Sequence, residues 1–138
     1  MVSIYPTQFP IVSAGIILVN KGNYNLAKKN SLGLWSFPEN NVPPGIYPKI
    51  TAQFSLYEQT GVYVDLSVLD EVPKYYFLSG TVLMYLVDVE LFRSRITLPQ
   101  FTPPPNDYVM TGWYSEHNVV YMLTSSSCDY CTKKWFYI

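Results

Sequence analysis

Residues 34–62 read LWSFPENNVPPGIYPKITAQFSLYEQTGV, and this stretch decides the fold. The stretch begins inside a short, mostly apolar segment, residues 32–37, which predicts a β-strand. The run of Pro, Asn and Gly that follows, up to Pro48, predicts a loop. Pro48 suits the first turn of a helix, where its missing N–H needs no partner. Gly61 suits the end of that helix, where the backbone commonly turns left-handed. The stretch therefore predicts a strand, a loop and a helix over residues 48–60.

Apolar segments on both sides of this stretch predict further strands. In the longest of these segments, residues 81–92, every position from Val82 to Val87 is apolar, which indicates burial on both faces. From Val87 onward apolar residues alternate with Asp and Glu, so one face is expected to reach water. The expected strands cover residues 12–20 and 24–29, joined by a turn at Lys21-Gly22-Asn23, then 63–66, and then 75–78 and 81–92, joined by a turn at Ser79-Gly80.

The last third of the chain combines a loop with expected helices. Residues 99–107 (PQFTPPPND) predict a rigid Pro-rich loop. Ser115 is a good N-cap for a helix to about Leu123, and a second helix is expected from the Ser-rich segment 125–127 to about Phe136. Strands interleaved with helices indicate a layered α/β or α+β domain. We expect one domain over residues 1–138, because a chain of this length forms little more than one.

The composition excludes several classes of protein. Apolar residues make up 49% of the chain and charged residues 14%, whereas disorder requires low hydrophobicity and high charge. The net charge of −1 gives no general basic footprint for nucleic acid. The uncharged segments 11–19 and 75–87 are shorter than a membrane helix of about 20 residues and contain Gly. We expect no membrane span and no signal peptide, and therefore an intracellular protein.

Residues 34–62 resemble the Nudix box and the segment before it. The Nudix signature is G-x5-E-x7-R-E-U-x-E-E-x-G-U, where U is a bulky aliphatic residue, and it usually follows a phrase such as W-x-F-P. Here the phrase is Trp35-Ser36-Phe37-Pro38, and the spacing to Thr60-Gly61-Val62 needs no gap. Residues 13–19 and Gly112-Trp113-Tyr114 resemble the family's opening strand and its late Trp before a helix.

The resemblance implies an α/β/α sandwich around a mixed central sheet. It also implies hydrolysis of a nucleoside diphosphate linked to another group, with divalent cations bridging the pyrophosphate and carboxylates of the box helix holding those cations. Magnesium prefers oxygen ligands from carboxylates and phosphates. It neutralises charge on phosphoryl oxygens and activates water. This chemistry needs several carboxylates that converge.

The box keeps most of its structural residues and loses most of its chemical ones. Glu58 is the sole carboxylate at the motif positions. The residues that match the signature are Leu56, Glu58, Gly61 and Val62. The replacements are Asn40 at the Gly position, Ile46, Ser55 and Gln59 at Glu positions, and Phe54 at the Arg position.

One carboxylate beside Phe54 is not expected to hold two metal ions, so we expect no hydrolysis by the usual Nudix mechanism and no cofactor. Magnesium or manganese would be needed only if hydrolysis survives. Asp107, six residues before Trp113, and Glu39 are further acids near the motif, and both are interpreted as solvated loop residues. Glu58 is the vestigial catalytic position, and the candidate ligand-binding residues are Trp35, Phe37, Phe54, Glu58, Gln59 and Asp107.

Cys128 and Cys131 form a C-x-x-C pair whose role the sequence leaves open. Zinc sites usually use four ligands, and the chain offers only these two cysteines and His117. A redox pair would follow a strand, and none is expected there. We interpret the pair as small apolar residues that pack one helical turn apart, and His117 as an exposed residue.

The low charge and the 13 tyrosines indicate that part of the surface is covered by a partner. Tyr is enriched at interfaces because it combines area with a polar tip. The chain has only two arginines, Arg93 and Arg95, which favours protein contact over nucleic acid. We expect a catalytically inactive Nudix-like binding or structural module that engages a protein or ribonucleoprotein assembly. The alternatives are a nucleotide- or RNA-binding pseudoenzyme and a divergent metal-dependent hydrolase.

Overall fold

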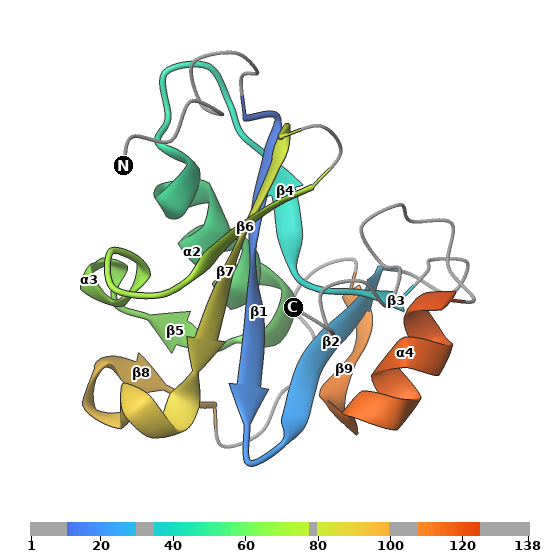
Figure 1. The fold of residues 1–138 in the computed structure, drawn as a ribbon. Helices are drawn as coiled ribbons and strands as arrows, with labels where there is room; N and C mark the ends of the chain where they lie inside the picture. The colour runs from blue at the N-terminus through green and yellow to red at the C-terminus, as the bar shows by residue number, and fades with distance from the viewer. Residues whose placement is uncertain (1–10, 30–34, 78–79, 100–107, 125–138) are drawn as a thin grey trace.

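The computed structural model describes residues 11–29, 35–77, 80–99 and 108–124, and its centre is a mixed β-sheet (Figure 1). Two helices, α2 (Pro48–Thr60) and α4 (Glu116–Thr124), pack against this sheet. The sheet strands are β1 (Ser13–Asn20), β2 (Asn23–Lys29), β3 (Trp35–Ser36), β4 (Glu39–Asn41), β6 (Lys74–Phe77), β7 (Val82–Asp88) and β9 (Tyr108–Ser115). The smaller elements are β5 (Tyr63–Val64), α3 (Leu66–Leu69), the 3₁₀ turns η1 (Val89–Leu91) and η2 (Arg93–Arg95), and β8 (Ile96–Thr97).

The sheet is organised around β1, which lies parallel to β7. The strand order is β3-β2-β1-β7-β6, while β4 pairs with the first half of β1 and β9 pairs with β2. Strands buried on both faces read as continuous apolar runs. This explains why β1 and β7 are uncharged through most of their length. It confirms the strand predicted over 12–20 and the part of the strand predicted over 81–92 that ends at Asp88.

The predicted hairpin between β1 and β2 closes through a two-residue turn, Lys21-Gly22. Both residues have positive φ angles, 53° and 81°. Such turns match the right-handed twist of the flanking strands, and Gly adopts this backbone region freely. The turn positions β2 so that it can pair along its length with β9.

Helix α2 begins and ends where the sequence predicts. Pro48 occupies its first turn, and Gly61 ends it with a φ of 80°. The Gly61 N–H donates to the carbonyl oxygen of Tyr57 at 2.9 Å, which satisfies one of the last free carbonyls of the helix. Ala52 and Leu56 are buried and fix the inner face of α2 on the sheet.

Two apolar cores lie on opposite faces of the sheet. Ile16 and Leu18 of β1 face α2 and α3, whereas Ile17 faces α4, because successive residues of a strand point to opposite faces. The β7 residues alternate in the same way. This arrangement confirms the predicted α/β/α sandwich around a mixed sheet.

Three local predictions are wrong. Residues 39–41 were expected in a loop, but they form β4 because β1 offers them an open edge. Residues 89–91 were expected in a strand, but the Asp88 side chain accepts a hydrogen bond from the Glu90 N–H at 3.0 Å and turns the chain into η1. Residues 108–115 were not expected to be a strand, but they form β9.

Two predictions near helix starts differ in outcome. The strand expected over 63–66 ends at Val64, because Asp65 accepts a hydrogen bond from the Ser67 N–H at 2.9 Å and caps α3. The predicted cap at Ser115 is confirmed, since its hydroxyl accepts from the Asn118 N–H at 3.4 Å. The helix expected to reach Phe136 lies outside the described residues. Among the described residues, no helix is long and apolar enough to cross a membrane.

Candidate functional site

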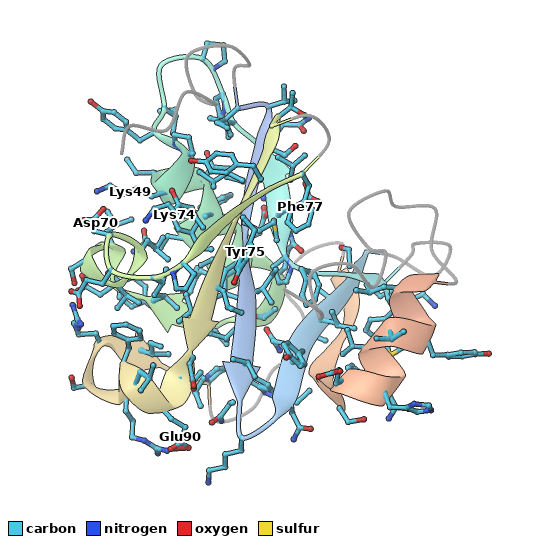
Figure 2. All side chains as sticks on the ribbon, viewed as in Figure 1. Lys49, Asp70, Lys74, Tyr75, Phe77 and Glu90 are labelled. Carbon is cyan, nitrogen blue, oxygen red and sulfur yellow. The ribbon has the colours of Figure 1, made fainter. Side chains whose placement is uncertain are left out.

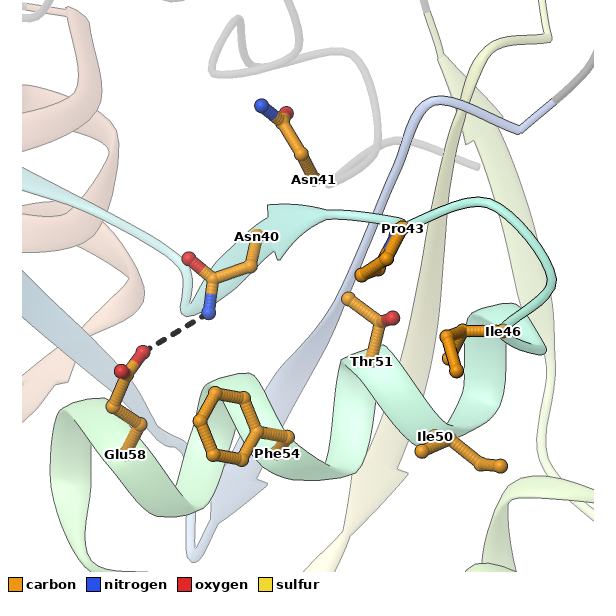
Figure 3. A pocket seen from close by; sticks show the side chains of 8 residues that line it. All are labelled: Asn40, Asn41, Pro43, Ile46, Ile50, Thr51, Phe54 and Glu58. Carbon is orange, nitrogen blue, oxygen red and sulfur yellow. Dashed lines mark hydrogen bonds between the residues drawn. The ribbon is translucent and has the colours of Figure 1, made fainter.

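A pocket of about 480 Å³ runs along the outer face of α2, beneath the segment that leads from β4 into the helix. Figure 3 shows Glu58 and Asn40 at one end of this pocket, and Ile46 and Ile50 at the other. The described residues that line it are Asn40, Asn41, Pro43, Ile46, Ile50, Thr51, Phe54 and Glu58. These include four of the positions that the resemblance singled out, namely 40, 46, 54 and 58.

Glu58 is held at its end of the pocket by β4. The Asn40 side-chain amide donates to Glu58 Oε1 at 3.1 Å (Figure 3). Asn40 comes from β4 because that strand pairs with β1 through Ala14 and Gly15. The end of the pocket thus presents one carboxylate and amide groups.

Apart from Asn41 and Thr51, the rest of the described pocket wall is apolar. Phe54 lies one helical turn before Glu58 on the same face of α2. Phe54 is 55% exposed, and Ile46 and Ile50 are also exposed. The positions of the signature Arg and first Glu therefore present hydrocarbon to solvent in this pocket.

Ser55 and Gln59 lie on the adjacent face of α2, beneath the pocket rather than in it. Ser55 is fully buried, and its hydroxyl donates to the Thr51 carbonyl oxygen at 2.7 Å. Gln59 is 3% exposed, and its Nε2 donates to the main-chain oxygen of Glu39 at 2.9 Å. Gln59 therefore joins α2 to β4, so its amide is already used within the fold.

The aromatic residues of the W-x-F-P phrase lie away from this pocket. Phe37 is fully buried in the core on the α4 side. Phe37 was expected to be a candidate ligand residue, but its side chain does not reach solvent in this arrangement. Trp35 packs edge-on against Tyr114 with ring centroids 5.4 Å apart, and Lys28 Nζ lies 5.9 Å from the Trp35 ring.

Other residues named from the sequence lie elsewhere. His117 is exposed on α4, as expected. Asp107, Cys128 and Cys131 lie outside the described residues. Within the described residues, no group of three or more His, Cys, Asp or Glu side chains is placed to hold a metal ion.

A second groove, which the sequence reasoning missed, lies on the other side of Phe54. Its volume is about 690 Å³, and its described lining is Ile50, Gln53, Phe54, Tyr57, Tyr63 and Thr97. The signal was present in the sequence, because Ile50, Phe54 and Tyr57 recur at helical spacing on the face opposite Ala52 and Leu56. A helix that is apolar on two faces has one face more than its own core requires.

Lys49 of α2 and Arg95 of η2 are engaged in ion pairs and line neither the pocket nor the groove. Lys49 Nζ lies 3.0 Å from an Asp70 carboxylate oxygen, and Figure 2 shows the two side chains together beside α3. Arg95 contacts Glu71 at 2.7 Å. The hydrogen bond and charge of Arg95 lower the pKa of the Glu71 carboxyl below its ordinary value. Neither the pocket nor the second groove has a basic residue among its described lining.

Solved structures of Nudix hydrolases share this fold. The chain is similar to a C. elegans Ap4A hydrolase binary complex, with 12% identity, 90% of this chain and 95% of that chain covered, and a TM-score of 0.61. It is also similar to a Nudix hydrolase from Nitrosomonas europaea, with 17% identity, 92% of this chain and 88% of that chain covered, and a TM-score of 0.60. A third similar structure is the MutT protein from Bacillus halodurans, with 15% identity, 80% of this chain and 71% of that chain covered, and a TM-score of 0.54.

These likenesses show that the chain has the Nudix fold. At this level of identity they show the fold alone. No model of a protein family matches the sequence, and no curated protein sequence matches it either.

Proposed function

We propose that this protein is a Nudix-fold binding module without pyrophosphate hydrolase activity, and that it engages a partner protein through the outer face of α2. The observation that carries this proposal is the lining of the α2 pocket. It presents the exposed apolar side chains of Ile46, Ile50 and Phe54 together with one carboxylate, Glu58.

The donor set argues against the metal chemistry of the fold. A magnesium site in a phosphate-transfer enzyme uses carboxylates that converge with phosphate oxygens. Among the described residues of the pocket, Glu58 is the only carboxylate, and its Oε1 already accepts from Asn40. The described residues do not fit the two-cation arrangement that the Nudix resemblance implies, so we derive no catalytic step through a metal.

The outer face of α2 has the chemistry of a protein interface. Phe54 is 55% and Tyr57 56% exposed. The other exposed apolar residues that line the pocket or the groove are Ile46, Ile50 and Tyr63. Exposed apolar surface of this kind is unfavourable in water unless something covers it. Aromatic side chains are enriched at the centres of protein interfaces.

The charges favour a protein over a nucleic acid as the partner. Contacts to phosphates supply much of the affinity for nucleic acid, and Lys and Arg make most of them. The described lining of both pockets contains no Lys or Arg, and it places Glu58 where a phosphate would be repelled.

The test is purification of the full chain from its native source under non-denaturing conditions. The mass of the complex and its ultraviolet absorbance ratio identify protein or nucleic acid in it. We expect a protein complex that Phe54→Ser abolishes. Leu91→Ser is the matched control, since Leu91 is 74% exposed on η1, away from α2.

Three outcomes would contradict the proposal. A monomer with no associated protein would remove the binding role. A complex that survives Phe54→Ser would place the interface elsewhere. Nucleic acid retained by wild type and lost with Phe54→Ser would favour an RNA- or nucleotide-binding role for the same face.

A further inference from the structure

The α2 pocket contains one charge, and nothing in its described lining balances it. Glu58 is the only ionisable residue among the eight that line the pocket. Asn40 donates one hydrogen bond to Oε1, and it is a neutral group. A partner that covers this pocket removes water from the carboxylate, which costs free energy unless the partner supplies a cation or donors.

The neighbour of Glu58 favours an organic cation over a metal ion. Phe54 lies one helical turn away on the same face, and more than half of this residue is exposed. Ammonium and guanidinium groups are attracted both to a carboxylate and to the face of an aromatic ring. A hard metal ion gains little from an aromatic ring and needs more oxygen ligands than the described residues provide.

The second groove extends the surface beyond the reach of one side chain. Ile50 and Phe54 line both the pocket and the groove, so the two adjoin along α2 with these side chains between them. Tyr57 and Tyr63 form the far part of the groove, and none of its described lining residues is charged. An occupant that fills both must carry a cation at one end and an apolar group at the other.

We propose that the α2 surface docks a polypeptide segment that places a Lys or Arg side chain against Glu58, and an aliphatic or aromatic side chain of the same segment between Phe54 and Tyr63. This inference rests on the proposed binding function and names the chemistry of the partner. Glu58, at the vestigial catalytic position, then selects a basic residue. Phe54 separates the two subsites and contributes to both.

The test is selection of random dodecamer peptides, displayed on phage, against the full 138-residue chain. Wild type should enrich peptides that pair Lys or Arg with a nearby apolar residue. Glu58→Gln should lose the basic preference and keep the apolar one. Glu116→Gln is the matched control, because Glu116 is an exposed acid on α4, and it should select as wild type does.

A second measurement changes the peptide instead of the protein in its main arm. One enriched peptide is compared with its variant in which the basic residue is replaced by norleucine. The replacement should weaken binding to wild type about tenfold or more, the scale of a hydrogen bond to a charged group, and leave binding to Glu58→Gln nearly unchanged. The wild-type arm of this comparison does not depend on how Glu58→Gln affects folding.

The inference is overturned if no peptide is enriched, if acidic or uncharged peptides dominate, or if Glu58→Gln keeps the basic preference. The inference is also overturned if wild type binds the norleucine peptide as tightly as it binds the original peptide. These results are separable from failure of the proposed function. A native protein complex that still requires Phe54 would leave that function standing while this inference fails.

Discussion

Restoring the signature glutamate at position 59 should destabilise this protein in a pH-dependent way. Gln59 is 3% exposed, and its Nε2 donates to the Glu39 carbonyl oxygen at 2.9 Å, which joins α2 to β4. An ionised glutamate has no donor to offer at this place, so two oxygens that both accept would face each other without water. A protonated glutamate can still donate.

The expected size of the effect follows from burial. Leaving a buried charge without a partner costs about 3 kcal/mol or more. Since a shift of one pKa unit corresponds to about 1.4 kcal/mol, a cost of about 3 kcal/mol raises the folded pKa of the new carboxyl about two units above its unfolded value of about 4.3. The folded pKa is raised, so stability is retained below about pH 4.3 and lost as the pH rises through about 6.5.

The assay is urea unfolding of Gln59→Glu and wild type at pH 4.5 and pH 8. We expect a difference in the free energy of unfolding of about 1 kcal/mol or less at the lower pH and about 3 kcal/mol at the higher. The matched control is Gln53→Glu, because Gln53 Nε2 also donates to a main-chain oxygen, that of Val64, at 2.8 Å. Gln53 is only half-buried.

Water can solvate the new carboxylate at position 53. Gln53→Glu should therefore lower the free energy of unfolding by less than about 1 kcal/mol at both pH values. Two results would refute the reasoning. Gln59→Glu could destabilise equally at both pH values, which would show that ionisation is not the cause. Gln53→Glu could match it at pH 8, which would show that burial is not the cause.

Three further predictions concern stability. Gly15→Ala should cost about 3 kcal/mol in urea unfolding, because the new Cβ meets the Pro38 carbonyl oxygen and lies 2.8 Å from Glu39 Cα; an unchanged midpoint would contradict this. Arg95 lowers the pKa of the Glu71 carboxyl below 4.5, so this ion pair stabilises the fold above that pH and its contribution is lost as the pH falls. The thermal unfolding temperature of wild type should therefore fall on acidification, and that of Glu71→Gln should fall less. Burial raises the Tyr85 pKa from 10.0 to about 12, so wild type should lose stability between these pH values in alkaline unfolding and Tyr85→Phe should lose less.

The parts of the fold that sequence could predict are those with strong local signals. Helix α2 has Pro48 at its start and Gly61 at its end, and the β1–β2 turn has Lys21-Gly22. Strand β4 could not be predicted, because the polar segment 39–41 becomes a strand only through the edge that β1 offers. The strand in 81–92 ends early because one side chain, Asp88, hydrogen-bonds two residues ahead and competes with pairing.

The site divides in the same way. Helical periodicity correctly placed Phe54 and Glu58 on one face of α2. It could not show that Gln59 is used by the main chain of Glu39, or that Phe37 is buried against α4, since both depend on contacts between segments distant in sequence. For the second groove, helical periodicity shows the wall formed by Ile50, Phe54 and Tyr57, whereas the wall formed by Tyr63 and Thr97 is known only from the folded chain.

Hydrolysis of nucleoside diphosphate derivatives tests the central claim most directly. The full chain is incubated with magnesium or manganese and a panel containing ADP-ribose, Ap4A and nucleoside triphosphates, and product is measured against a blank without protein. Wild type and Glu58→Gln should both give no turnover above the blank. Metal-dependent turnover by wild type that Glu58→Gln abolishes would contradict the account and identify a working hydrolase.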